Sequence, residues 1–336
     1  MPLDESPPAC HNWHMPAPLE ENPYAASRET RPVDQPPHAP SLAAARLLVL
    51  AAATLWSTSG FFAKAPYFAH WPGPALAFWR AAFACVVLWP MVRRPQWSWK
   101  LVPMTAVFAA MNYTYLTAMA KGSAANAIWL QCTAPVWVLL LGVFVFRERA
   151  IFRDWLLIAF SAAGVAIILF YESRAANLEA VMWGLASGVF YAGVVLSLRN
   201  LRSMESAWLV ALNHLVTAIV LSIPYAFILA SGKSSAAVPW PATGIQWLLL
   251  AGFGILQMGL PYVLFARGLR SIPGHEAAGI GLVEPLLVPV WVALAWGDKP
   301  AWWTLAGGGL ILVGLAIRYL YLPPASIPAD SGSEAV

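Results

Sequence analysis

The chain has 336 residues, of which 60% are hydrophobic and 11% are charged, and its formal net charge is +4. Soluble domains carry about a quarter charged residues, so this composition excludes an ordinary water-soluble globule. The basic residues lie in short connections between apolar stretches, which excludes a nucleic-acid-binding surface as the reason for the positive charge.

The first forty residues differ in composition from the rest. They hold six of the 16 acidic residues and ten of the 28 prolines. A segment so polar and so rich in proline cannot bury a core, so we expect residues 1–42 to be a disordered cytoplasmic tail. No apolar stretch begins before Ala43, so we expect the first span to act as an uncleaved signal-anchor.

Ten apolar stretches follow, each long enough to cross about 30 Å of hydrocarbon. Their approximate limits are 44–64, 72–92, 101–120, 123–146, 152–171, 179–198, 206–230, 245–267, 275–296 and 301–321. The sequence therefore predicts an all-α polytopic membrane protein with ten transmembrane helices and a short cytoplasmic tail at 322–336.

The basic residues alternate between the two sides of the predicted membrane. With the amino terminus in the cytoplasm, the inside segments hold 14 of the Lys and Arg residues and the outside segments hold five. This distribution predicts that both termini lie in the cytoplasm. We expect the membrane to be the cytoplasmic (inner) membrane.

The second half of the chain partly repeats the first. The aligned pairs are Pro135 with Pro285, Glu148 with Asp298, and Arg80 with His214. We therefore expect two repeats of five spans, at 43–172 and 178–321. Since five is an odd number, the second copy enters the membrane from the opposite face, and such inverted repeats commonly place a substrate site between the halves.

These features resemble the EamA-type members of the drug/metabolite transporter superfamily across about residues 44–321. The residues that carry the resemblance are Leu55-Trp56-Ser57, Arg80, Pro135 followed by Glu148, and Glu284-Pro285 followed by Gly297-Asp298. The resemblance implies ten helices in two EamA repeats and secondary active transport, often the efflux of amino acids or other small metabolites by alternating access. Asp298 departs from the glutamate that the family usually has there.

Three ionisable residues lie deep in predicted spans, where each costs about 2.5–3.5 kcal/mol at the helix centre. Glu284 is about nine residues into its span and therefore near the midplane. It either borders the central cavity, where it binds a substrate amine or carries a coupling proton, or forms a fixed ion pair or hydrogen bond. Arg80 either holds a substrate carboxylate or fixes helix packing, and His214 either relays a proton or packs.

Other residues at middle depth either contact an organic solute or pack between helices and against lipid. The aromatic and amide candidates are Trp56, Trp79, Asn112, Tyr115, Gln131, Tyr191 and Gln257. Pro135, Pro285 and Pro289 are expected to bend their helices, because proline cannot donate the helical hydrogen bond. Broken backbone at this depth is tolerated where it lines a protein-buried or watery cavity.

The sequence shows no motif of an intramembrane enzyme, such as HExxH or a Gly-x-Ser-x-Gly elbow. We therefore expect a carrier without a cofactor or a metal, whose partners are the lipid bilayer, a small organic solute and protons as the coupling ion. Metabolite uptake and multidrug efflux are the alternatives within transport. A non-transporting scaffold and an enzyme are the alternatives outside it, and a homo-oligomer stays open.

Overall fold

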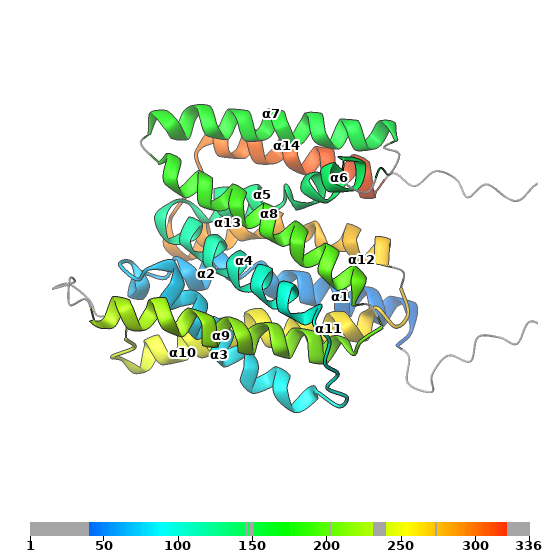
Figure 1. The fold of residues 1–336 in the computed structure, drawn as a ribbon. Helices are drawn as coiled ribbons and strands as arrows, with labels where there is room; N and C mark the ends of the chain where they lie inside the picture. Colours follow the sequence, from blue (N-terminus) through cyan, green and yellow to red (C-terminus); the bar gives the residue numbers. More distant parts are fainter. Residues whose placement is uncertain are drawn as a thin grey trace, which may run out of the picture. The chain divides into compact units, whose positions relative to one another are not determined.

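The computed structural model describes residues 40–144, 147, 151–175, 177–201, 203–230, 240–272 and 274–320. Within these ranges all regular structure is helical, without a β-strand (Figure 1). Apart from residues 40–42, the two predicted tails lie outside the described residues, and so does Glu148.

The helices of each half follow one another along the chain. The first half contains α1 (Leu42–Trp56), α2 (Ser59–Ala63), η2 (Pro66–Phe68), α3 (Gly73–Leu88), η3 (Trp89–Met91), α4 (Leu101–Lys121), α5 (Ala124–Gln131), α6 (Ala134–Phe144) and α7 (Phe152–Arg174). The second half contains α8 (Leu178–Asn200), α9 (Ser206–Ala230), α10 (Gly244–Gly254), the π-helical turn η4 (Ile255–Gly259), α11 (Leu260–Gly268), α12 (Gly274–Gly281), α13 (Val283–Trp296) and α14 (Trp302–Tyr319).

Nine helical segments of the described ranges are long and apolar enough to cross a membrane. The expected third span, α4, is not among them, although it has 21 residues. It carries polar residues such as Asn112, Thr114 and Thr117, and these are buried against protein. A helix that faces protein instead of lipid does not need a uniformly apolar surface. The chain is an all-α membrane protein, and the count of ten spans stays a prediction.

The contacts between helices repeat from one half to the other. Helices at corresponding positions in the two halves pack against each other: α3 on α9, α5 on α13 and α7 on α14. The contact of α4 with α8 has its counterpart in the contact of α1 with α11, which is the same pair after the halves are exchanged. This exchange is what a pseudo-two-fold relation between two repeats produces.

The long helices α7 and α14 lie along each other (Figure 1). A Cβ atom added to Gly164 of α7 would collide with the backbone oxygen of Gly307 of α14, so the two backbones approach as closely as glycine allows. At one end of the pair, Arg318 Nε lies 2.6 Å from Asp154 Oδ1, and the Asp154 side chain is 6% exposed. The other oxygen of Asp154 accepts a hydrogen bond from the Ile151 backbone N–H and caps α7.

Candidate functional site

One predicted span in each half is broken in the middle. In the first half, two residues separate α5 from α6, and Pro135 lies in the first turn of α6. In the second half, one residue separates α12 from α13, and Glu284 and Pro285 lie in the first turn of α13. Since proline lacks the N–H that a continuing helix requires, each break falls just before a proline. Because α5 packs on α13, the breaks lie where the two halves meet.

A hydrogen bond joins the two broken helices. Pro289 lies inside α13 and cannot donate to the carbonyl of Pro285, four residues earlier. The indole Nε1 of Trp129 in α5 donates to that carbonyl at 2.9 Å, and Trp129 is buried. The donor that the helix lacks is therefore supplied by the other half of the chain.

Helix α8 lies directly on the break between α5 and α6. A Cβ atom added to Gly188 would be 2.6 Å from Thr133 Oγ1 and 2.8 Å from the Leu130 carbonyl oxygen. Gln131, at the end of α5, is buried beside this contact. Only a glycine lets α8 approach the broken backbone this closely.

Glu284 is half-buried, and its carboxylate has no hydrogen-bond or ion-pair partner among the residues that the structure describes. The side chains that interact electrostatically with it come from four helices and from the break between α5 and α6: Arg80 on α3, Tyr115 on α4, Cys132 in the break, Tyr191 on α8 and Tyr262 on α11. Because helices of both halves surround it, the accessible part of this carboxylate faces the space between them.

Arg80 is sealed inside the protein, with 1% of its surface exposed. One terminal nitrogen donates to Asn112 Oδ1, and the other has no hydrogen-bond partner within the described ranges. The guanidinium carbon lies 5.2 Å from the ring centre of Phe253 and 5.9 Å from that of Tyr115. Arg80 and Glu284 interact electrostatically, but no ion pair joins them.

His214 is equally buried and lies near Arg80 and Tyr262. Its Nδ1 atom forms a hydrogen bond with the Val210 carbonyl oxygen at 2.9 Å, and its Nε2 atom has no hydrogen-bond partner among the residues that are described. Its ring centre lies 5.9 Å from that of Tyr262 and 5.1 Å from that of Phe108. His214 therefore contacts Tyr262, which in turn interacts electrostatically with Glu284.

The remaining candidates on α1, α4, η4 and α8 lie around the same region. Trp56 packs edge-on against Tyr262, with ring centres 5.2 Å apart, and its carbonyl accepts a hydrogen bond from Gln257 Nε2 at 3.1 Å. The Tyr115 hydroxyl pairs with Ser59 Oγ at 3.1 Å. Tyr191 is 41% exposed and interacts electrostatically with Glu284 and Tyr262.

Trp79 packs against other aromatic rings. Its indole N–H donates to the Tyr225 hydroxyl at 3.2 Å, and its ring centre is 5.0 Å from that of Trp247 and 5.6 Å from that of Trp240. The structure thus places Trp79 in an aromatic cluster with residues of α9 and α10.

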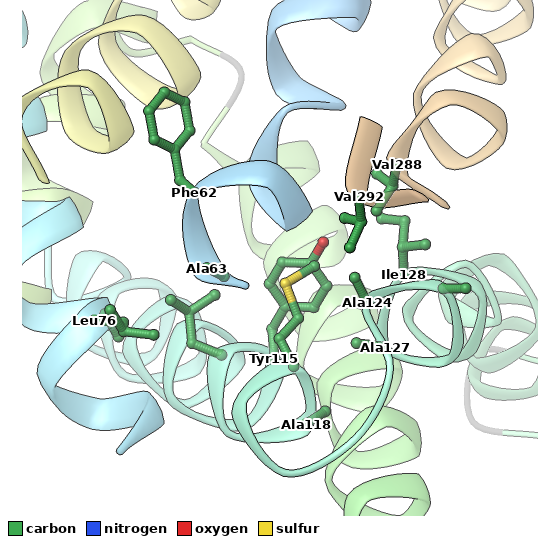
Figure 2. Packing of buried hydrophobic residues seen from close by; sticks show 14 of the residues in the cluster. Phe62, Ala63, Leu76, Tyr115, Ala118, Ala124, Ala127, Ile128, Val288 and Val292 are labelled. Carbon is green, nitrogen blue, oxygen red and sulfur yellow. The ribbon is translucent and has the colours of Figure 1, made fainter. Parts of the chain in front are cut away.

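One end of the contact between the halves is closed. Figure 2 shows Ala124, Ala127 and Ile128 of α5 facing Val288 and Val292 of α13, all within one buried apolar cluster. A Cβ atom on Gly60 of α2 would be 2.6 Å from the Val292 side chain, which leaves no space between α2 and α13.

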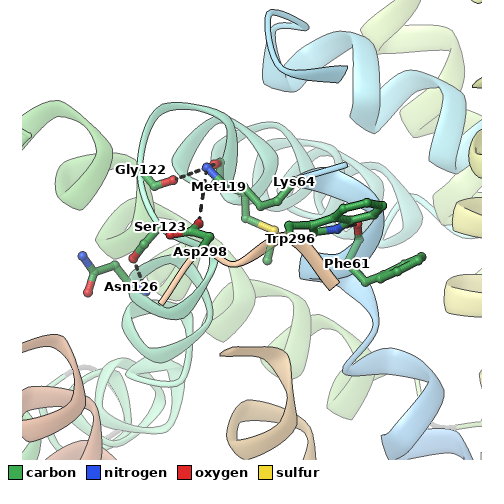
Figure 3. Close-up of polar contacts among 8 residues, drawn as sticks. All are labelled: Phe61, Lys64, Met119, Gly122, Ser123, Asn126, Trp296 and Asp298. Atoms are coloured by element: carbon green, nitrogen blue, oxygen red, sulfur yellow. Dashed lines mark hydrogen bonds and ion pairs between the residues drawn. The ribbon is translucent and has the colours of Figure 1, made fainter. Parts of the chain in front are cut away.

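Polar contacts cover this closed end (Figure 3). Lys64, just after α2, donates to the Gly122 carbonyl at 2.9 Å and lies 4.0 Å from Asp298. The indole of Trp296 donates to the Phe61 carbonyl at 2.8 Å and stacks on the Phe61 ring with centres 5.1 Å apart. These contacts run from α2 in the first half to the end of α13 in the second.

Three residues of this region were not predicted from the sequence: Tyr262, Cys132 and Ser59. Two usable signals existed, namely Pro261 inside an apolar stretch and the run of small and polar residues from Ser57 to Gly60, which begins where α1 ends. Within the described ranges, no group of three His, Cys, Asp or Glu side chains could hold a metal ion.

The chain matches the EamA-like transporter family twice, over residues 44–170 and 178–320. Pseudopaline exporter CntI of Pseudomonas aeruginosa is 28% identical over 255 residues, which cover 72% of this chain and 84% of the exporter. An uncharacterized transporter of Archaeoglobus fulgidus is 26% identical over 206 residues, 61% of this chain and 71% of the transporter.

A solved crystal structure has a similar fold. It superposes with a TM-score of 0.57 at 18% sequence identity and covers 83% of this chain and 97% of its own. The likeness concerns the fold, since the identity is too low to carry over a substrate.

Proposed function

Because this chain belongs to the EamA-like transporter family, we propose that it is a secondary active transporter that exports amino acids or other small organic metabolites by alternating access. The observation that carries the proposal is the position of Glu284 at the break before α13, where helices of both halves surround it. Its carboxylate is accessible and has no partner among the described residues. An intramembrane carboxylate is costly unless it has a function or a partner.

The proposal includes the arrangement of the chain in the membrane. The two five-span repeats are 43–172 and 178–321, inverted with respect to each other, with both termini in the cytoplasm of an inner membrane. In Figure 1 the start of α1 and the end of α14 point to the same side, which supports an even number of crossings. The pseudo-two-fold pairing of helices supports the inverted relation.

Alternating access requires that the site opens to one side at a time. The contacts of Lys64, Phe61 and Gly60 close the end of the interface that the charge distribution assigns to the outside. Tyr191, in contrast, is accessible next to Glu284. This combination supports a state that is closed to the outside and accessible from the cytoplasm, which is the loading state of an exporter.

The site residues take different roles in this proposal. Glu284 binds a substrate amine or carries the coupling proton, with Tyr115, Tyr191, Trp56 and Gln257 around it. Pro135, Pro285 and Pro289 keep the broken helices open at this depth. The export direction is supported by the similarity to a protein that is named a pseudopaline exporter.

Transport into and out of proteoliposomes tests the function. A mass-spectrometric screen of metabolites, followed by flux with and without a pH gradient, identifies the solute and its coupling. Glu284→Gln is expected to lose proton-coupled flux, whereas the surface variant Glu179→Gln, in which the carboxylate is 65% exposed, keeps it. Normal, coupled flux in Glu284→Gln would remove the role given to Glu284. The absence of any solute flux would remove the function.

A further inference from the structure

The ionisable side chains at the centre of the protein differ sharply in accessibility. Arg80 and His214 each expose 1% of their surface, whereas Glu284 is half-buried and its carboxylate has no partner in the part of the chain that the structure describes. Glu284 is therefore the charged group in this set that a solute can reach. A carboxylate in a poorly solvated space favours a cationic partner.

Arg80 is also committed to protein contacts. Asn112 accepts a hydrogen bond from one of its terminal nitrogens, and the Asn112 Nδ2 donates in turn to the Phe108 carbonyl at 2.8 Å. The rings of Phe253 and Tyr115 lie over the guanidinium. Its second terminal nitrogen is buried and inaccessible. A solute carboxylate has no route to this cation in the state that the structure shows.

The groups next to Glu284 suit a cation as well. Tyr115, Tyr191 and Tyr262 interact with Glu284 from three different helices, and Trp56 packs against Tyr262. The faces of aromatic rings attract organic cations, most strongly where water is excluded. An ammonium group bound by Glu284 would lie within electrostatic range of these three tyrosines.

We propose that the central site selects its solutes by an ammonium or similar organic cation, which Glu284 binds among Tyr115, Tyr191 and Tyr262, and that a carboxylate on the solute is not required. This inference rests on the proposed function in that the central site is the substrate site. It narrows the substrate class to amines, including amino acids recognised through their amino group, and excludes organic acids without a cationic group.

Three probes that share a phenyl ring and a short carbon chain but differ in charge test which charged group the site recognises. Phenethylamine carries the cation alone, phenylalanine carries both charges, and 3-phenylpropionate carries the anion alone. Binding to the purified full-length protein is measured as the concentration-dependent rise in its unfolding temperature. We expect phenethylamine to bind more tightly than 3-phenylpropionate by about tenfold or more, with phenylalanine no tighter than phenethylamine.

Two variants assign the effect to Glu284. Glu284→Gln is expected to weaken phenethylamine binding by about tenfold or more and to leave that of 3-phenylpropionate unchanged. The surface control Glu179→Gln should bind all three probes as the unaltered protein does. Equal or tighter binding of the acid, binding of the amine that survives Glu284→Gln, or no binding of the amine would each overturn the proposal.

Flux assays on the same probes keep this inference separate from the proposed function. If phenethylamine binds through Glu284 but crosses no vesicle membrane, cation selection stands and transport fails. If only the acid is carried, transport stands and cation selection fails.

Discussion

Trp129 and Gly308 are in direct contact, ring against backbone. A Cβ atom added to Gly308 of α14 would overlap the six-membered ring of the Trp129 indole. The N–H of the same indole donates the hydrogen bond to the Pro285 carbonyl on α13. Gly308 thus sets the position of the side chain that links the two broken helices.

Replacing Gly308 by alanine should therefore destabilise the protein. The added methyl group displaces a buried indole, and overpacking of this kind costs about 1–3 kcal/mol. Gly309→Ala is the matched control, because a Cβ atom there meets nothing within 4 Å. Alanine at 309 should be neutral or stabilising by up to about 1 kcal/mol. Denaturant unfolding in detergent micelles measures both, and equal stabilities would contradict the contact.

Trp129→Phe should remove the hydrogen bond and keep most of the ring. It leaves the Pro285 carbonyl buried without a donor, which costs about 1–3 kcal/mol. Trp302→Phe changes an indole that is 60% exposed and should stay within about 0.5 kcal/mol of the unaltered protein. The free energy of unfolding of the two variants tests the prediction. It fails if Trp129→Phe is no less stable than Trp302→Phe.

The contacts of Lys64 should control access from the closed end. Lys64→Met removes the hydrogen bond to the Gly122 carbonyl and the attraction to Asp298, so the closed state should lose population. The reporter is a cysteine at Ser59, which is 1% exposed behind the closed end, in a background without native cysteines. Membrane-impermeant maleimide should label it faster after Lys64→Met.

Lys121→Met provides the control for this labelling experiment. It removes an exposed ion pair with Glu179 that lies outside the contact of α2 with α13. The labelling rate should then stay unchanged. Equal acceleration by both variants would show that Lys64 does not hold the closed end.

The two ion pairs that join helices, Asp154–Arg318 and Glu276–Arg46, should contribute differently to the free energy of unfolding. Asp154→Asn breaks a pair with a buried carboxylate that also caps α7, so a loss of about 1–3 kcal/mol is expected. Glu276→Gln breaks the pair with Arg46, whose side chains are 27% and 53% exposed, and should cost less than about 1 kcal/mol. Unfolding free energies of the two variants test the order, and the reverse order would refute it.

The helices of this protein were largely predictable from local sequence. Apolar length located the nine candidate spans, and Pro135 and Pro285 located the breaks in the middle of two of them. The break between α1 and α2 was missed, because a run of small hydroxyl residues inside an apolar stretch is compatible with a continuous helix.

The candidate site was predictable only in part. Glu284, Tyr115 and Tyr191 were expected at the centre from their depth, and the structure brings them together. Trp79 was a candidate for the same reason, and the structure places it against Trp240 and Trp247. Depth in a span says how far a residue is from the membrane surface but not which way its side chain points.

The sequence by itself determined that the chain is a helical membrane protein of two related halves, because apolar length, charge and repeated motifs are properties of the chain alone. Only the tertiary structure decided that Arg80 is sealed behind Tyr115 and Phe253 while Glu284 stays accessible. Accessibility and charge partnership depend on side chains from other helices, so they exist only once the two halves have packed together.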